Sequence, residues 1–257
     1  MKIVVLAGGL STERDVSLAS GAGICKTLRE RGHDAFLLDV YLGFPQAPEN
    51  LEDVFSLPNA GLEIAEGIKT TEPDLVAVKA SREDQSDCFV GPNVIDICRL
   101  ADIVFMALHG DVGENGKLQA TFDILGIRYT GPNYLGSALA MDKGIAKQIF
   151  KTSGVPTPLG TALKKENKDV ALADLGLKLP VVVKPCSGGS SVGTSVVNCE
   201  EEYAPALEFA FKYEEDVLVE KFIKAREVTV GVMDGKAMEV IEIIPKSGFY
   251  DYKNKYQ

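Results

Sequence analysis

The stretch VVVKPCSGGSSVG, residues 181–193, decides how the second half of this chain folds and what it can bind. It begins as a run of valines typical of a buried strand, places Lys184 at the end of that run, and continues as glycine and serine. Glycine leaves backbone N–H groups open to close around phosphate oxygens, and Ser190 and Ser191 add hydroxyl donors. The stretch therefore predicts a phosphate-binding loop with a lysine at its base. A flexible hairpin loop with a surface lysine is the alternative that the stretch alone leaves open.

Two other nucleotide-binding patterns do not fit the chain. Gly188 and Gly193 have the spacing of a Walker A loop, but Thr194 follows where that motif has lysine, and the next segment is predicted as a strand. The turn at Gly8–Gly9 follows a first strand but lacks the glycine spacing of a dinucleotide-binding motif. NAD binding is therefore disfavoured, and the first part of the chain is better suited to a small substrate at its strand ends.

The N-terminal half predicts a doubly wound α/β domain with a parallel sheet, because short apolar runs alternate with amphipathic stretches. The segment DLVAVK, residues 74–79, is also predicted as a strand. The expected strands are 3–7, 35–40 and 102–108. A helix is expected over about 15–31, and a short helix with Leu118, Phe122 and Leu125 on one face is expected to end at Gly126.

The C-terminal half predicts helices with an antiparallel sheet. One helix is expected over 137–153, with Met141 and Ile145 facing the core, and Asp234–Gly235 is typical of a two-residue hairpin turn. Strands are expected on both sides of the glycine loop and at 217–223, 227–233 and 236–243, with a helix at 200–213. The predicted domains are 1–133 for substrate, 134–219 for a central nucleotide lid and 220–257 for the start of a C-terminal subdomain.

Composition limits the partners and the compartment. The chain has 257 residues and a net charge of −10, so nucleic acid and anionic membranes are not expected as partners. No apolar run approaches the roughly 20 residues of a membrane span. The five cysteines are widely spaced and form no CxxC pair, which favours reduced thiols in the cytoplasm over a disulfide framework or a zinc site.

Six separated stretches, taken together and in order, resemble D-alanine–D-alanine ligases of the ATP-grasp superfamily. The resemblance implies an N-terminal domain followed by an ATP-grasp α+β domain that is incomplete at its C-terminal end. It also implies a reaction in which ATP activates one D-alanine as an acyl phosphate and the amine of a second D-alanine attacks it, for peptidoglycan precursor synthesis. The stretches are AGGLSTERDVSLASG (7–21), ALHGDVGENGKLQ (107–119), GSALAMDKGIAK (136–147), VVVKPCSGGSSVGTS (181–195), EKFIKAREVTVGV (220–232) and SGFYDYKNKY (247–256).

The resemblance implies a set of ATP-binding residues. Two lysines are expected on the phosphates, a glycine–serine lid over them, and a hinge that binds adenine through a glutamate side chain and two backbone positions; a further glutamate is expected on the ribose. Without the resemblance, the first lysine would be a solvated helix residue and the hinge a half-buried strand. The implied residues are Lys143, Lys184, Gly189, Ser191, Glu220, Lys221, Ile223, Glu227 and Lys255.

The resemblance also implies substrate-binding residues. Glu13 is expected to hold the ammonium of the first D-alanine, steadied by Ser190 and Tyr256, and Glu13 and Ser190 are the implied catalytic residues. His109 is expected beside the substrate carboxylate. A helix cap for Glu13 and a hydrogen-bonded structural histidine for His109 are the alternatives. The hydroxyl of Tyr256 favours an amine as the acceptor, with D-serine still open as the second substrate.

The chain departs from the family pattern at its end. It stops at Gln257, and the magnesium ligands of such ligases are expected beyond that residue, so none is assigned here. The 257 residues alone are expected to be a nucleotide-binding fragment without turnover. A homodimer through the N-terminal domain is a further expectation from the family.

Overall fold

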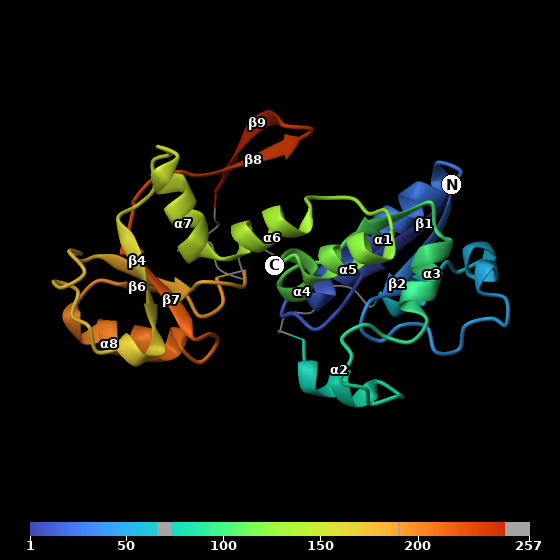
Figure 1. Cartoon of the computed structure of the whole chain (residues 1–257), viewed down its shortest axis with the longest axis horizontal. Helices are drawn as coiled ribbons and strands as arrows, with labels where there is room; N and C mark the ends of the chain where they lie inside the picture. The colour runs from blue at the N-terminus through green and yellow to red at the C-terminus, as the bar shows by residue number, and fades with distance from the viewer. Residues whose placement is uncertain (66–72, 190, 245–257) are drawn as a thin grey trace. The chain divides into compact units, whose positions relative to one another are not determined.

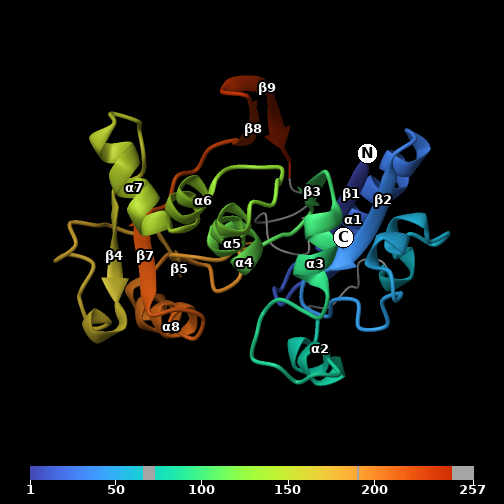
Figure 2. The same ribbon diagram turned by 45° about the vertical axis from the view of Figure 1, so that its right-hand side comes forward.

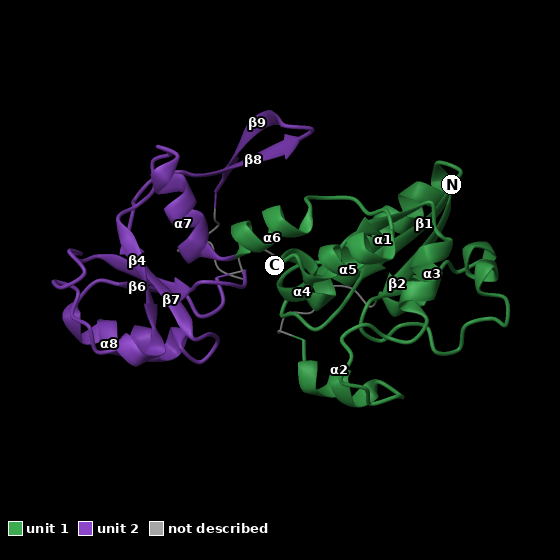
Figure 3. Ribbon diagram, viewed as in Figure 1, with its two compact units in different colours: residues 1–141 green, residues 142–257 purple. Residues whose placement is uncertain are grey.

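The chain folds as two compact units, shown in different colours in Figure 3. The structure is a computed structural model that describes residues 1–65, 73–189 and 191–244. The first unit is Met1–Met141 and the second is Asp142–Gln257. The predicted three-part division into 1–133, 134–219 and 220–257 stays a prediction.

The first unit is built on a three-stranded parallel sheet with β1 in the centre, between β2 and β3 (Figure 1). Side chains alternate across β1, so that Val5 belongs to the core cluster on the α1 face, while Val4 and Leu6 belong to the cluster of α3 and α5. Helices on both faces make this the predicted doubly wound domain. Its elements are β1 (Lys2–Ala7), α1 (Arg14–Glu30), β2 (Asp34–Asp39), η1 (Leu51–Ser56), η2 (Leu62–Ile64), α2 (Leu75–Ser81), α3 (Val94–Leu100), β3 (Ile103–Met106), α4 (Asp111–Glu114), α5 (Lys117–Leu125) and α6 (Tyr134–Met141).

The predicted strand at 74–79 is wrong, because this segment is helix α2 (Figure 2). Asp74 caps the helix, and its side chain accepts hydrogen bonds from the backbone N–H groups of Val76 and Ala77. Val76 is exposed, so the apolar run is not a buried strand. The cap decides the local structure where the valines alone suggested a strand.

The second unit contains a four-stranded antiparallel sheet in the order β4-β7-β5-β6 and a separate two-stranded sheet, β8-β9. Helix α8 packs on one face of the larger sheet through a core that includes Val181, Val183 and Leu207. The elements are α7 (Lys143–Thr152), β4 (Gly160–Lys164), η3 (Lys165–Asn167), β5 (Val181–Pro185), β6 (Ser195–Val197), α8 (Glu200–Ala210), β7 (Asp216–Lys221), β8 (Glu227–Met233) and β9 (Lys236–Ile243).

The single helix predicted over 137–153 is wrong, because Asp142 separates two helices, α6 and α7. The Asp142 side chain accepts a hydrogen bond from the backbone N–H of Ile145 and so starts a new helix. Ile145 was expected in the core but is 46% exposed. The buried residue of α7 is instead Lys147, which makes the polar face of this helix the one that packs inward.

Candidate active site

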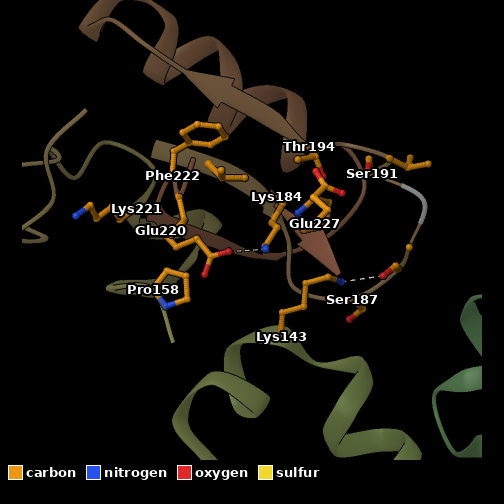
Figure 4. Close-up of a pocket in the computed structure, with 16 residues that line it drawn as sticks. Lys143, Pro158, Lys184, Ser187, Ser191, Thr194, Glu220, Lys221, Phe222 and Glu227 are labelled. Atoms are coloured by element: carbon orange, nitrogen blue, oxygen red, sulfur yellow. Dashed lines mark hydrogen bonds and ion pairs between the residues drawn. The ribbon is translucent and has the colours of Figure 1, made fainter. Parts of the chain in front are cut away.

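A pocket of about 450 Å³ lies in the second unit, and the predicted phosphate loop forms part of its wall (Figure 4). The other walls come from β5, β7, the start of α7 and the segment that follows β7. Eight of the predicted ATP-binding residues line it. They are Lys143, Lys184, Gly189, Ser191, Glu220, Lys221, Ile223 and Glu227.

Strand alternation explains how Lys184 reaches the pocket. Val181 and Val183 point into the α8 core, so Val182 and Lys184, one residue out of phase, lie on the opposite face and line the pocket. On the neighbouring strand β7 the same alternation buries Val219 in that core and places Glu220 on the pocket face. Glu220 is paired with Val182 in the sheet, which makes Lys184 its diagonal neighbour.

The glycine loop needs its glycines for backbone shape. Gly188 and Gly193 have φ values of +76° and +70°, in the left-handed region that residues with a Cβ rarely adopt. At Gly193 a Cβ would also lie 2.8 Å from the side chain of Pro185. The loop therefore returns to the end of β5, where Gly193 lies against Pro185, and Gly188 and Gly189 line the same pocket as Lys184.

Lys143 is fixed to this loop by hydrogen bonds. Its Nζ donates to the carbonyl oxygens of Gly188 at 2.8 Å and Cys186 at 3.3 Å (Figure 4). Burial, and then the nearby Lys184 ammonium, lower the pKa of Lys143 from its ordinary value. Two cations that repel each other in one pocket are suited to a ligand with several negative charges.

Glu220 joins two lysines through its two carboxylate oxygens. Oε1 accepts from Lys184 Nζ at 2.5 Å, and Oε2 accepts from Lys147 Nζ at 2.6 Å. Burial alone would raise the pKa of Glu220, but the hydrogen bonds from Lys147 and Lys184 and their charges outweigh it, so that this pKa lies below its ordinary value. The prediction that this carboxylate accepts from adenine stays a prediction.

The hinge residues lie at the pocket with one backbone group already used. The N–H of Lys221 donates to the carbonyl oxygen of Leu159 at 2.8 Å, so that group does not serve a ligand. Ile223 is half exposed, and Glu227 lies at the start of β8. Their predicted contacts with the adenine and ribose stay predictions.

Cys186 has a buried thiol at the edge of the site. It is buried, and burial, followed by the charges of Asp142 and Asp216, raises the pKa of its thiol to about 11. What Cys186 supplies to the site is its carbonyl oxygen, which accepts from both the backbone N–H and the Nζ of Lys143. All five cysteines are free.

In the first unit, Glu13 and His109 lie near each other at the carboxyl ends of β1 and β3. Glu13 is buried, and a Cβ added at Gly110, the residue after His109, would lie 2.9 Å from its Oε2. Glu13 stands at the N-cap of α1, where its charge is favoured by the helix dipole, although its side chain makes no capping hydrogen bond, so the cap alternative stays open in its electrostatic form. The Nε2 of His109 lies 3.2 Å from Ser20 Oγ, and its Nδ1 lies 4.0 Å from Glu114 Oε1.

Buried Arg14 and Asp39 hold the turn that carries Glu13. Arg14 pairs with Asp39 and donates to the carbonyl oxygen of Gly9 at 2.7 Å. Asp39 also accepts from the backbone N–H groups of Tyr41 and Leu42, which gives it a structural role.

Three predicted site residues, Ser190, Lys255 and Tyr256, lie outside the described residues. Sequence reasoning missed Lys147, which the structure buries against Glu220. The available signal was its spacing, because Lys147 follows Lys143 by one helical turn and therefore shares its face. Within 1–65, 73–189 and 191–244, no three His, Cys, Asp or Glu side chains come together as a metal site, so no step through magnesium is assigned to these residues.

Comparison with known proteins places the chain in a family. The family model for the D-ala D-ala ligase N-terminus matches residues 2–132, and the model for the D-ala D-ala ligase C-terminus matches residues 149–257. The chain belongs to the D-alanine–D-alanine ligase family. The resemblance predicted from the sequence is therefore confirmed, and with it the enzyme class, an ATP-dependent ligase of D-alanine.

Individual ligases of this family are similar to the chain in sequence and in fold. A D-alanine–D-alanine ligase of Pediococcus pentosaceus is 44% identical over the whole chain, which covers 72% of that protein. A crystal structure of the Bacillus anthracis D-alanine–D-alanine ligase complexed with ATP has a TM-score of 0.67 at 28% identity, over 95% of this chain and 66% of its own. The Enterococcus faecalis VanG D-Ala:D-Ser ligase has the same TM-score at 29% identity, over 100% of this chain and 73% of its own.

Among the described helices, none combines the length and the apolar character needed to span a lipid bilayer.

Proposed function

We propose that the second unit binds ATP in the pocket described above, with Lys143 and Lys184 on its phosphates, and that the first unit holds the first D-alanine. The observation that carries the proposal is the convergence of Lys143 and Lys184 at a glycine loop, since two ammonium groups at one loop suit a polyphosphate. The hinge residues Lys221 and Ile223 then lie on the adenine, and Glu227 on the ribose.

The residues support the two steps of the ligation as follows. A carboxylate oxygen of the first D-alanine attacks the γ-phosphorus of ATP, and ADP leaves with the electron pair of the broken P–O bond. Lys143 and Lys184 offset the charge on the transferring phosphoryl group, which is the main requirement of this chemistry. The amine of the second D-alanine then attacks the acyl carbon, inorganic phosphate leaves, and the amine loses a proton.

Glu13 and His109 position the first D-alanine in this proposal. The carboxylate of Glu13 accepts from the substrate ammonium, and the His109 ring donates to the substrate carboxylate. Both side chains lie at the ends of parallel strands, the usual place for small ligands in such sheets.

The test measures phosphate and ADP release with ATP, magnesium and either D-alanine or D-serine, on the 257 residues and on the protein of the complete reading frame. The proposal expects D-alanine-dependent release from the complete protein. Calorimetry with ATP on the 257 residues distinguishes an active ligase from a nucleotide-binding fragment without turnover. Heat of binding without phosphate release would indicate the fragment. A preference for D-serine would reassign the second substrate.

The remaining expectations belong to the same proposal. The protein acts in the cytoplasm, which its free thiols suit, and does not bind nucleic acid or membranes, because its net charge is −10. A homodimer through the first unit is tested by light scattering, where a monomer mass would contradict it.

A further inference from the structure

Lys147 is a buried cation to which the proposed function gives no role. It is 6% exposed and does not line the nucleotide pocket. Its Nζ donates to Glu220 Oε2 at 2.6 Å and lies 3.2 Å from Thr157 Oγ1. A lysine ammonium is rarely buried to this extent unless it is paired, and here its charged partner is the carboxylate that also binds Lys184.

The charges of the three residues show what Lys147 does for the pocket. Lys184 and Glu220 alone would form a neutral pair, so the pocket would gain nothing from the charge of Lys184. With Lys147 on the second carboxylate oxygen the group carries a net charge of +1. Lys147 therefore offsets Glu220 from inside the protein, and the positive charge of Lys184 stays available to a ligand.

The geometry gives Glu220 a second role as a fixed support. Its two oxygens each hold one ammonium, at 2.5 Å and 2.6 Å, so the plane of the carboxylate is set from both sides. The side chain of Lys184 is 25% exposed and that of Lys147 only 6%. The buried lysine thus orients the carboxylate, and the carboxylate orients the lysine that faces the pocket.

We propose that Lys147 is a positioning residue for the nucleotide, acting through Glu220 to keep Lys184 oriented and its charge uncompensated at the phosphates. The proposal rests on the proposed function, since it takes the phosphates to lie at Lys184. A positioning role and a purely structural role of Lys147 predict different effects on ligand binding. A structural pair would affect all ligands of a folded protein equally, whereas a charge effect grows with the negative charge of the ligand.

The experiment measures binding of a non-hydrolysable ATP analogue and of adenosine by calorimetry. Lys147→Met keeps a side chain of similar volume and removes the charge. Because one nearby positive charge is lost, the affinity for the ATP analogue is expected to fall about tenfold, while the affinity for the uncharged adenosine changes less than about twofold. Lys151→Met, an exposed lysine one turn further along α7, is the matched control and is expected to leave both affinities unchanged. Lys147→Arg keeps the charge and is expected to restore most of the analogue affinity.

The double variant Lys147→Met with Glu220→Gln provides the decisive arm. It removes both offsetting charges and returns the net charge to that of Lys184 alone. Because Glu220 lines the pocket and is expected at the adenine that both ligands carry, the quantity compared is the ratio of analogue affinity to adenosine affinity. This ratio is expected to return to within about threefold of its value in the unmodified protein. Unchanged analogue affinity in a folded Lys147→Met protein would overturn the proposal, and so would a double variant in which the ratio of analogue affinity to adenosine affinity is no higher than in Lys147→Met.

Folding is checked by circular dichroism for every variant. If Lys147→Met does not fold, the double variant still tests the proposal. A tenfold loss of analogue affinity in the double variant, without a loss of adenosine affinity, would refute the charge argument. Lys184→Met distinguishes the two proposals. Unchanged analogue affinity in that variant refutes the phosphate site itself, whereas a loss there with none in Lys147→Met refutes only the role of Lys147.

Discussion

Replacing Lys184 by methionine removes the ammonium at the base of the glycine loop while keeping the side-chain stem. A hydrogen bond to a charged group contributes about 1.5–3 kcal/mol, which corresponds to a loss of about 10- to 150-fold in nucleotide affinity. The side chain of Lys184 is one quarter exposed, so water partly screens its charge. We therefore expect the lower part of that range, about 10- to 30-fold.

The same variant should fold normally. Glu220 loses one of its two lysines but keeps Lys147 at 2.6 Å, so its carboxylate is still paired. The expected cost in the free energy of unfolding is about 1 kcal/mol, as for a typical hydrogen bond. A large loss of stability would mean that the two lysines act on the fold and not only on the ligand.

The assay is calorimetric titration with the non-hydrolysable ATP analogue, with unfolding in urea as the stability control. Lys164→Met is the matched comparison, because Lys164 ends a strand of the same sheet, is exposed and does not line the pocket. The expected result is weaker binding for Lys184→Met alone. Equal affinities in the two folded variants would remove Lys184 from the nucleotide site.

Three further predictions follow from individual contacts. Glu13→Gln should leave the affinity for the ATP analogue unchanged and raise the KM for D-alanine in the complete protein; an unchanged KM would remove Glu13 from the substrate site. Gly160→Ala should lower the free energy of unfolding by about 1–3 kcal/mol, because the added Cβ would lie 2.4 Å from Glu220 Cβ. Gly23→Ala is the control and should not destabilise the protein, because a Cβ there meets nothing within 4 Å. Equal losses of stability in the two variants would contradict the packing argument. The two lysines hold the pKa of Glu220 below the ordinary glutamate value of about 4.5, so its contribution to stability is present above about pH 4.5 and is lost as the pH falls through the folded value. The free energies of unfolding in urea of the unmodified protein and of Glu220→Gln should therefore differ most near neutral pH and converge in acid, and a constant difference would contradict this.

The parts of the fold that the sequence predicted were those with one strong local pattern. The apolar run IVVLA followed by Gly8–Gly9 predicted β1 and its turn, because few other structures bury such a run. Asp234–Gly235 predicted the β8-β9 hairpin for the same reason. Periodicity alone misassigned residues 74–79, where the capping side chain of Asp74 favours a helix.

The site was predicted where a residue type is unusual for its position and missed where it is common. Lys184 stands between an apolar strand and a glycine loop, so its place in the pocket wall beside that loop could be predicted from the sequence. Lys147 stands on a helix among other polar residues, where a solvated lysine is the ordinary case. Its burial depends on Glu220, which is 73 residues further along the chain, and no local pattern contains such a contact.

Every residue that lines the nucleotide pocket comes from the second unit, while Glu13 and His109 belong to the first. The residues expected to bind the amino-acid substrate are nevertheless divided between the units, because Ser190 and Tyr256 belong to the second. A chimera that exchanges residues 1–141 between relatives would therefore show how much of the amino-acid selectivity goes with Glu13 and His109 and how much stays with the second unit.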